Sequence, residues 1–136
     1  MKKAFADSDY WVALLNPSDQ LHRRAIKVSI DFGEILIVTT EMVLTEVLNF
    51  YSRRGETLRQ LAVKMVLQLR INPHVIIVPQ TSVGFQLAVR LYESRADKEW
   101  SLTDCSSILT MEEQRIKEVL SSDHHFHQAG LTPLLS

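Results

Sequence analysis

This sequence of 136 residues has one cysteine, no long apolar run and almost no excess of either charge. Cys105 is the only cysteine, which excludes an internal disulfide framework and favours a reducing compartment. No apolar run approaches the roughly 20 residues that a membrane-spanning helix needs. The formal net charge of -1 gives no compositional sign of nucleic-acid binding. We therefore expect a soluble, cytoplasmic protein with no membrane partner.

Several of the basic residues occur in doublets. Lys2-Lys3 leads directly into FADSD without an apolar stretch, so we expect no signal peptide. The doublets Arg23-Arg24 and Arg53-Arg54 have two interpretations: they lie on solvated helix faces, or they contact a phosphate backbone. With 46% hydrophobic residues and this length, the chain can bury one core, and we expect a single domain over residues 1–136.

Short apolar runs alternate with segments of helical period along the whole chain. The runs predict strands at 3–7, 34–38, 74–79 and 117–123, with a short fifth strand at 131–135. A short helix or turn is expected at 10–15, and helices are expected at 18–31, 40–54, 56–70, 81–95 and 101–116. Ser18, Thr39 or Thr40, and Ser101 or Thr103 are candidate N-caps, and Gly33 is a natural helix stop. This alternation predicts an α/β fold with a mainly parallel sheet.

Four carboxylates follow from this expected fold as candidates for one site. Ligands of parallel sheets bind beyond the carboxyl ends of the strands, where Asp7 and Asp123 end the first and fourth strands. Glu46 and Asp104 lie on helices that could enter from the same edge. Clustered carboxylates repel one another, and a hard divalent cation such as Mg²⁺ or Mn²⁺ is the usual compensation. Each acid also has a simpler interpretation, as a turn former, a helix-end charge or an exposed helix residue.

Four segments in order resemble the PIN-domain family, especially the VapC-like ribonuclease toxins of bacterial toxin–antitoxin pairs. FADSDYWVALLNPSDQLH is similar to the family's opening strand and helix, and TTEMVLTEVLNFYSRR to the helix that carries its glutamate. SLTDCSSILTMEEQRI is similar to the helix that begins with its third acid, and EVLSSDHHFHQAGLTPLL to its closing segment. The resemblance runs from Ala4 to Leu135, nearly the whole chain.

The resemblance implies a three-layer sandwich with a sheet of order 3-2-1-4-5 and Mg²⁺- or Mn²⁺-dependent hydrolysis of RNA. It implies that three aspartates hold metal directly or through water, and that the glutamate helps to hold metal or orients the attacking water. It also implies an RNA substrate and a cognate antitoxin that covers the site. For the assembly we expect a homodimer. The residues carried over are Asp7, Glu46, Asp104 and Asp123, with Ser8 and Ser121 as supporting hydroxyl groups.

The chain departs from the family pattern at Asp9, where a small residue is expected. Asp9 either adds charge to the rim of the site or caps the following helix, and we favour the cap. Asp97 and Glu99 either extend the acidic cleft or lie in a solvated loop.

Three histidines follow Asp123 but have no separate metal-binding signature, so we expect them to pack or to lie at the surface around a buried Phe126. Of the three, His124 is the best candidate for contact with substrate phosphate.

Two other classes of function stay open from the sequence. DSD at 7–9 resembles the DxD motif of aspartyl-phosphate phosphatases, although SSDHH lacks the acidic pair of that class. A PIN-like module that binds RNA or protein without cutting would fit the same fold, although all four acids are present. Within the nuclease interpretation, a toxin and a stand-alone RNA-processing enzyme are both open. The apolar faces of the helices at 41–52 and 56–70 either pack in the core or seat a partner.

Overall fold

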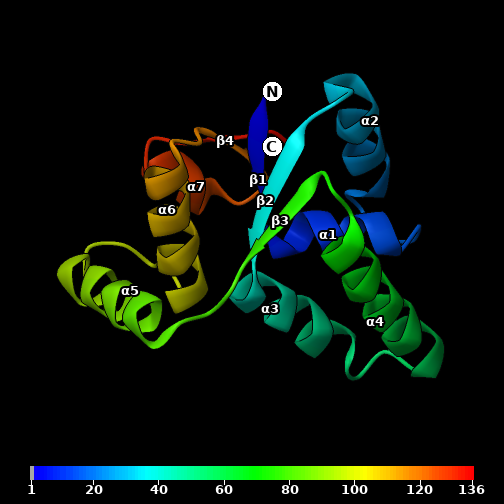
Figure 1. Ribbon diagram of the computed structural model, residues 1–136, viewed down its shortest axis with the longest axis horizontal. Coiled ribbons are helices and arrows are strands. Elements are labelled where there is room, and N and C mark those ends of the chain that lie inside the picture. Colours follow the sequence, from blue (N-terminus) through cyan, green and yellow to red (C-terminus); the bar gives the residue numbers. More distant parts are fainter. Residues whose placement is uncertain (1) are drawn as a thin grey trace.

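The computed structural model describes residues 2–136, which form one parallel sheet with helices on both faces. Figure 1 shows α5, α6 and α7 on one side of the sheet and α1, α2 and α4 on the other. The elements in chain order are β1 (Lys3–Ala6), α1 (Ser8–Leu15), α2 (His22–Phe32), β2 (Leu36–Thr40), α3 (Glu41–Tyr51), α4 (Glu56–Ile71), β3 (Val75–Val78), α5 (Ser82–Ser94), α6 (Leu102–Gln114), β4 (Glu118–Leu120), α7 (His124–Gln128) and β5 (Thr132–Pro133).

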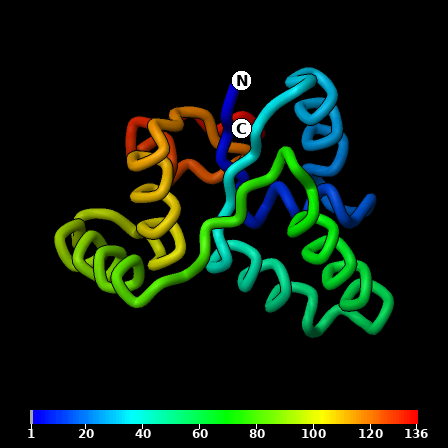
Figure 2. Tube along the Cα trace, in the orientation of Figure 1, coloured from blue at the N-terminus to red at the C-terminus, as the bar shows by residue number. Residues whose placement is uncertain are grey.

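The sheet has the order β3-β2-β1-β4-β5, and every pairing in it is parallel. The expected strand order, 3-2-1-4-5, is therefore confirmed. The chain builds outward from β1 to β3 on one side and then crosses back to add β4 and β5 on the other, a path that can be followed in Figure 2. The switch point lies between β1 and β4, whose Phe5 and Val119 are register partners.

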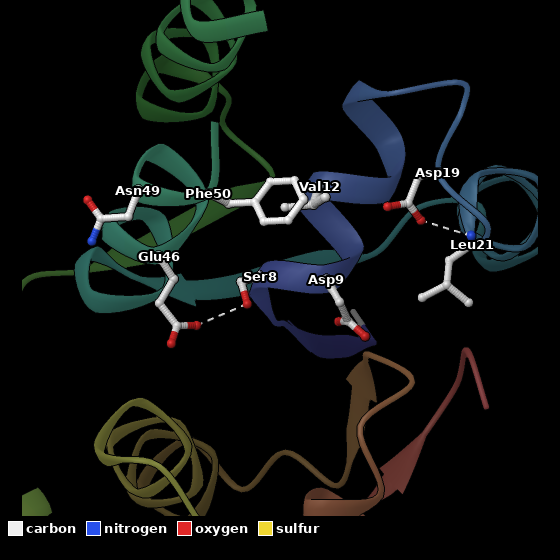
Figure 3. A pocket seen from close by; sticks show the side chains of 8 residues that line it. All are labelled: Ser8, Asp9, Val12, Asp19, Leu21, Glu46, Asn49 and Phe50. Atoms are coloured by element: carbon white, nitrogen blue, oxygen red, sulfur yellow. Dashed lines mark hydrogen bonds between the residues drawn. The ribbon is translucent and has the colours of Figure 1, made fainter. Parts of the chain in front are cut away.

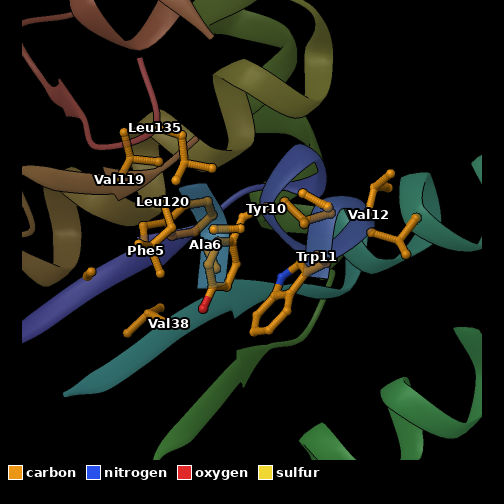
Figure 4. Close-up of a cluster of buried hydrophobic side chains, with 14 of the residues drawn as sticks. Phe5, Ala6, Tyr10, Trp11, Val12, Val38, Val119, Leu120 and Leu135 are labelled. Atoms are coloured by element: carbon orange, nitrogen blue, oxygen red, sulfur yellow. The ribbon is translucent and has the colours of Figure 1, made fainter. Parts of the chain in front are cut away.

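The central strand is buried on both faces, which is why its sequence is apolar without alternation. Ala4, Phe5 and Ala6 have no exposed surface, and Val38 of β2 and Val119 of β4 extend the same core on either side. Figure 4 shows Phe5, Ala6, Val38 and Val119 in one cluster with Leu120 and with Tyr10 and Trp11 of α1. This core ties the first turn of α1 to the sheet.

A hydrogen-bonded path reinforces the contact between α1 and the sheet. The indole Nε1 of Trp11 donates to Thr39 Oγ1 over 3.3 Å, and that hydroxyl donates to the carbonyl of Ala6 over 2.8 Å. Tyr51 of α3, also fully buried, donates its hydroxyl to the carbonyl of Val12 over 2.8 Å. Buried polar groups on α1, α3 and β2 are thereby satisfied, and the ends of β1 and α3 are held in a fixed relation.

The start of the second helix was predicted wrongly. The helix begins at His22 rather than after Ser18. The side chains of Asn16 and Asp19 accept the backbone N–H groups of Ser18 and Leu21 over 3.0 and 2.9 Å, which favours turns over helix in this segment. The predicted stop is confirmed, because Gly33 is the C-cap with a φ of 61°.

Strand bounds also differ from the prediction. β1 ends at Ala6, one residue before the predicted end, and β4 ends at Leu120, three residues before it. In both cases the chain turns away from the sheet at the residues that follow. β2 lies two residues later than expected, at Leu36–Thr40. The five-residue helix α7 was not predicted at all. Thr40 and Ser101, by contrast, are confirmed as N-caps of α3 and α6.

The apolar residues of α2 are only partly buried. Ala25 has no exposed surface, but Ile26 is 39% exposed and Ile30 is 73% exposed. On α3 the predicted stripe is confirmed at Val43 and Val47, which have no exposed surface. Among residues 2–136, every helix is too short or too polar to span a bilayer.

Candidate active site

The candidate site lies at the carboxyl ends of β1 and β4, on either side of the switch point. Asp7 follows β1 directly and occupies the N-cap position of α1, and its backbone N–H donates to the carbonyl of Leu120 over 3.2 Å. Ser121 follows β4 and is fully buried. Its hydroxyl donates to Asp7 Oδ2 over 3.3 Å, which joins the two strand ends. This is the position that the sequence predicts for the first acid and for one of its supporting hydroxyl groups.

Asp7 is an acid that is costly to ionise in the absence of a counter-charge. It is only 5% exposed, and burial raises its pKa well above the ordinary value. The negative charge of Asp9 raises this pKa further, and the charges of Asp104 and Glu46 contribute in the same direction. The backbone N–H of Ser8 acts in the opposite direction. Asp9, Asp104 and Glu46 therefore lie within electrostatic range of Asp7.

Glu46 reaches the site from α3. Thr40 caps this helix by accepting the N–H of Val43 over 3.0 Å, and the buried face of the helix packs on the core. Glu46 is one of its partly exposed residues, and its Oε1 accepts a hydrogen bond of 3.0 Å from Ser8 Oγ. Figure 3 shows this bond from α1 to α3. Glu46 is thus held next to the residue that follows Asp7, and Ser8 has the supporting position that was expected of it.

Asp104 enters from the first turn of α6. It forms a reciprocal capping box with Ser101: each residue's side chain accepts the other's backbone N–H over 3.0 Å. Asp104 is 7% exposed. The carboxylate stabilises the start of its helix, as one of its two interpretations from the sequence expects, and it also contacts His125 in the segment that follows β4.

Asp123 is the N-cap of α7, and its Oδ1 accepts the backbone N–H of His125 over 2.9 Å. The N–H of Asp123 itself donates to Ser121 Oγ over 3.0 Å. Ser121 therefore bonds to two of the four acids. The side chain of Asp123 is 30% exposed, whereas Asp7 is only 5% exposed. Asp123 therefore faces the opening of the site, and Asp7 lies deeper.

His125 connects the remaining acids, which the sequence did not predict. Its Nδ1 lies 3.1 Å from Asp104 Oδ2 and 3.2 Å from Asp123 Oδ1, and its side chain is 19% exposed. Phe126, fully buried as predicted, anchors α7 and so orients the ring. Spacing alone could not reveal this contact, because the direction of each side chain depends on the short helix that was missed.

The neighbouring histidines do not share this position. The side chain of His124 is 77% exposed, although its Nδ1 lies 3.8 Å from Asp123 Oδ1, and His127 is exposed. Within residues 2–136, histidines are the only basic groups within 4.0 Å of the four acids. The acids therefore converge without a lysine or arginine to neutralise them.

Asp9 does not cap the following helix, so that expectation is wrong. Its Oδ2 accepts both the N–H and the hydroxyl of Ser122, each over 2.8 Å, and so binds the segment between β4 and α7. Its Oδ1 is buried and has no hydrogen-bond partner within residues 2–136. Burial raises the pKa of Asp9. Asp9 instead adds a negative charge beside Asp7, which was the other alternative.

Asp97 does not extend the acidic cleft. Arg95 binds both of its carboxylate oxygens, over 2.9 and 3.0 Å, and holds the pKa of Asp97 at about 2. Glu99 is exposed in the same loop. At the opposite edge of the sheet, Lys2 pairs with Glu118 over 3.1 Å, so the first basic doublet lies at the ends of the strands that face away from the acids.

A pocket of about 460 Å³ opens beside the acids, between α1 and α3. Figure 3 shows acidic and apolar side chains on its wall. Arg54 packs on the ring of the lining residue Phe50, with its guanidinium carbon 3.6 Å from the ring centroid. The lining residues are Ser8, Asp9, Val12, Asp19, Leu21, Glu46, Asn49 and Phe50.

Comparison with known proteins agrees with this architecture. The sequence model of the PIN domain matches residues 4–131. A search of curated protein sequences found no match. Among solved structures, the crystal structure of Mycobacterium tuberculosis VapC20, described as a sarcin-ricin loop cleaving toxin, has a TM-score of 0.84 to this chain. The two are 23% identical, and the match covers 95% of this chain and 96% of VapC20, which shows a shared fold.

Proposed function

The chain belongs to the PIN-domain family, and from this premise we propose that it is a metal-dependent endoribonuclease whose residues 1–136 act as one nuclease domain. The observation that supports this most is a single network of contacts around the four acids. It runs from Glu46 through Ser8 to the helix capped by Asp7, and from Asp7 through Ser121 to Asp123. His125 continues it to Asp104.

The donor set fits Mg²⁺ or Mn²⁺. Carboxylate oxygens are the ligands that both ions prefer, and a bound cation would offset the burial and then the neighbouring charges that raise the pKa of Asp7. Asp7, Asp104 and Asp123 would hold the ion. When bound, such an ion neutralises phosphate charge and lowers the pKa of a bound water.

The protein's own residues have separate roles in this proposal. Glu46, fixed by Ser8 over 3.0 Å, orients the attacking water or adds a ligand. Ser8 and Ser121 are positioning residues, because they act through the carboxylates that they bind.

We assign the enzyme the role of a toxin in a toxin–antitoxin pair, acting on RNA in the cytoplasm. The support is the likeness in fold to VapC20, and the alternative is a stand-alone RNA-processing nuclease. A structured ribosomal stem-loop of the sarcin-ricin type is accordingly the first substrate to test. The pocket of about 460 Å³ beside the acids carries negative charge on Asp9, Asp19 and Glu46, which would attract a basic side chain of an antitoxin.

A homodimer is the assembly that we propose. Two helices present large apolar side chains to solvent: on α4, Leu67 is 56% and Ile71 82% exposed, and on α5, Val83 is 66% and Tyr92 56% exposed. Apolar surface of this extent favours association with a second copy. Light scattering after size exclusion should give twice the mass of 15.6 kDa. A monomeric mass at micromolar concentration would contradict the proposed dimer.

The function is tested by incubating purified protein with a pool of structured RNAs that includes a sarcin-ricin stem-loop. Parallel reactions contain Mg²⁺, Mn²⁺ or EDTA, and the Asp123→Asn variant serves beside the unmodified protein. We expect cleavage that requires a divalent ion and is lost in the variant. Cleavage in EDTA, or full activity of Asp123→Asn, would contradict the proposed site. RNA binding without cleavage in any condition would favour a non-cutting module.

A further inference from the structure

We propose that His125 is a nitrogen ligand of the bound ion and makes the site select Mn²⁺ over Mg²⁺. The inference rests on the proposed function, because it concerns the ion held by the same acids. It goes beyond a purely carboxylate site, which would bind either ion through oxygen. The observation that carries it is the place of the His125 ring between two of the acids.

His125 Nδ1 lies from each of two acids at the distance that separates adjacent ligands of one ion. In an octahedral shell with ligands at about 2.1 Å, adjacent ligands lie about 3.0 Å apart. His125 Nδ1 is 3.1 Å from Asp104 Oδ2 and 3.2 Å from Asp123 Oδ1. The tautomer with its hydrogen on Nε2 has a lone pair on Nδ1, directed at the space that these carboxylates share. His125 Nδ1 can therefore occupy a position next to either carboxylate oxygen around one cation.

The ring is held in place before any ion binds. Asp123 accepts the backbone N–H of His125 over 2.9 Å, and the fully buried Phe126 follows it on the same short helix. The side chain of His125 is 19% exposed, whereas that of its neighbour His124 is 77% exposed. Little conformational entropy is then lost when Nδ1 coordinates a metal, which favours binding. One ligand atom each from Asp123, His124 and His125 lies within 4.8 Å of the others.

The chemistry of imidazole gives the preference. Mg²⁺ is a hard ion that takes oxygen donors and retains water, so a nitrogen ligand adds little to its binding. Imidazole nitrogen adds more to the binding of transition ions, and Mn²⁺ accepts it while keeping the carboxylate ligands. A site of two or three carboxylates and one imidazole therefore gains affinity for Mn²⁺ selectively. His125 thereby sets which ion loads the site when both are present.

The rival role for His125 is that of a hydrogen-bond donor that only positions the two carboxylates. The substitution His125→Asn separates the two roles. The amide nitrogen of asparagine keeps a donor near the position of Nδ1 but has no lone pair for a metal, and its amide oxygen gives no imidazole nitrogen signal. His127→Asn is the matched control, because His127 is exposed on the same helix. His124→Asn tests the other histidine near Asp123.

The first measurement is pulsed electron paramagnetic resonance of Mn²⁺ bound to the full chain, with no RNA present. We expect modulation from a directly coordinated imidazole ¹⁴N in the unmodified protein, in His127→Asn and in His124→Asn, and its loss in His125→Asn. A spectrum without nitrogen coupling in the unmodified protein would overturn the proposal. Loss of the coupling in His124→Asn, with retention in His125→Asn, would also overturn it.

The second measurement is metal affinity, by calorimetry for Mn²⁺ and by competition for Mg²⁺. We expect His125→Asn to weaken Mn²⁺ binding by roughly tenfold, while Mg²⁺ affinity stays close to that of the unmodified protein. Equal losses for both ions would assign His125 a positioning role and overturn the proposal. Asp123→Asn separates this failure from that of the proposed function, because it should abolish binding of both ions whether or not His125 is a ligand.

Discussion

Replacing Asp7 by asparagine should make the metal-free protein more stable while it removes RNA cleavage. Asp7 is 5% exposed and surrounded by the charges of Asp9, Asp104 and Glu46, which all raise its pKa. A buried charge without a counter-ion costs on the order of several kcal/mol. The hydroxyl of Ser121 and the N–H of Ser8 offset part of this cost. We therefore expect a gain of about 2 kcal/mol at pH 8.

The gain should depend on pH in a defined direction. The ordinary pKa of this carboxyl is 3.8, and the folded value lies well above it. The folded protein thus keeps its proton on Asp7 at pH values where the unfolded chain has lost it, and the contribution of Asp7 to stability falls as the pH rises above about 4. Asparagine does not titrate. The advantage of Asp7→Asn should consequently be larger at pH 8 than at pH 5.

Thermal unfolding in EDTA measures this effect. For a domain of this size, 2 kcal/mol corresponds to a rise in Tm of about 6–10 °C. Asp31→Asn is the matched control, because Asp31 is exposed and forms only an i,i+4 pair with Lys27, whose loss costs a few tenths of a kcal/mol. Adding Mn²⁺ at pH 8 should then stabilise the unmodified protein more than Asp7→Asn. A lower Tm for Asp7→Asn in EDTA at pH 8, or a difference that does not change with pH, would refute the reasoning.

Three further outcomes follow from other contacts. Asp9→Asn removes a charge that raises the pKa of Asp7, so the acid limb of the pH–activity profile for RNA cleavage should move to lower pH; a shift to higher pH would contradict the assignment. Phe126→Ala empties a fully buried site and should cost about 3–5 kcal/mol in urea unfolding, with weaker Mn²⁺ binding because α7 loses its anchor; unchanged stability would exclude that role. Tyr51→Phe removes the hydrogen bond of 2.8 Å to Val12 and should cost about 1 kcal/mol by the same measurement, and no loss would show that the bond contributes nothing.

The parts of the structure that depend on local pattern were predictable from the sequence. Apolar runs without alternation located the buried strands, and the hydroxyl of Thr40 before an apolar stripe located the start of α3. The placement of Asp7 and Asp123 at one edge followed from the parallel sheet alone, because the carboxyl ends of parallel strands share an edge.

The predictions that failed concern features that depend on tertiary contacts, or on side chains that compete with the backbone for hydrogen bonds. Asn16 and Asp19 bind backbone N–H groups and delay α2 by four residues, which a hydrophobic period does not register. Asp9 sits where a cap is plausible, yet its partner Ser122 is more than a hundred residues away. The inward turn of His125 results from a short helix whose orientation is set by the burial of Phe126.

The bond from Ser121 to Asp7 spans 114 positions of the chain, and it has a consequence for the timing of activity during synthesis. A nascent chain that ends before β4 already contains Asp7, Glu46 and Asp104, but β1 lacks its neighbour β4 and the last acid does not exist. Such a chain has no complete site. On the proposed function, a ribosome therefore carries a harmless intermediate through most of translation, and the capacity to cut RNA arises only when the segment around Asp123 has emerged and docked.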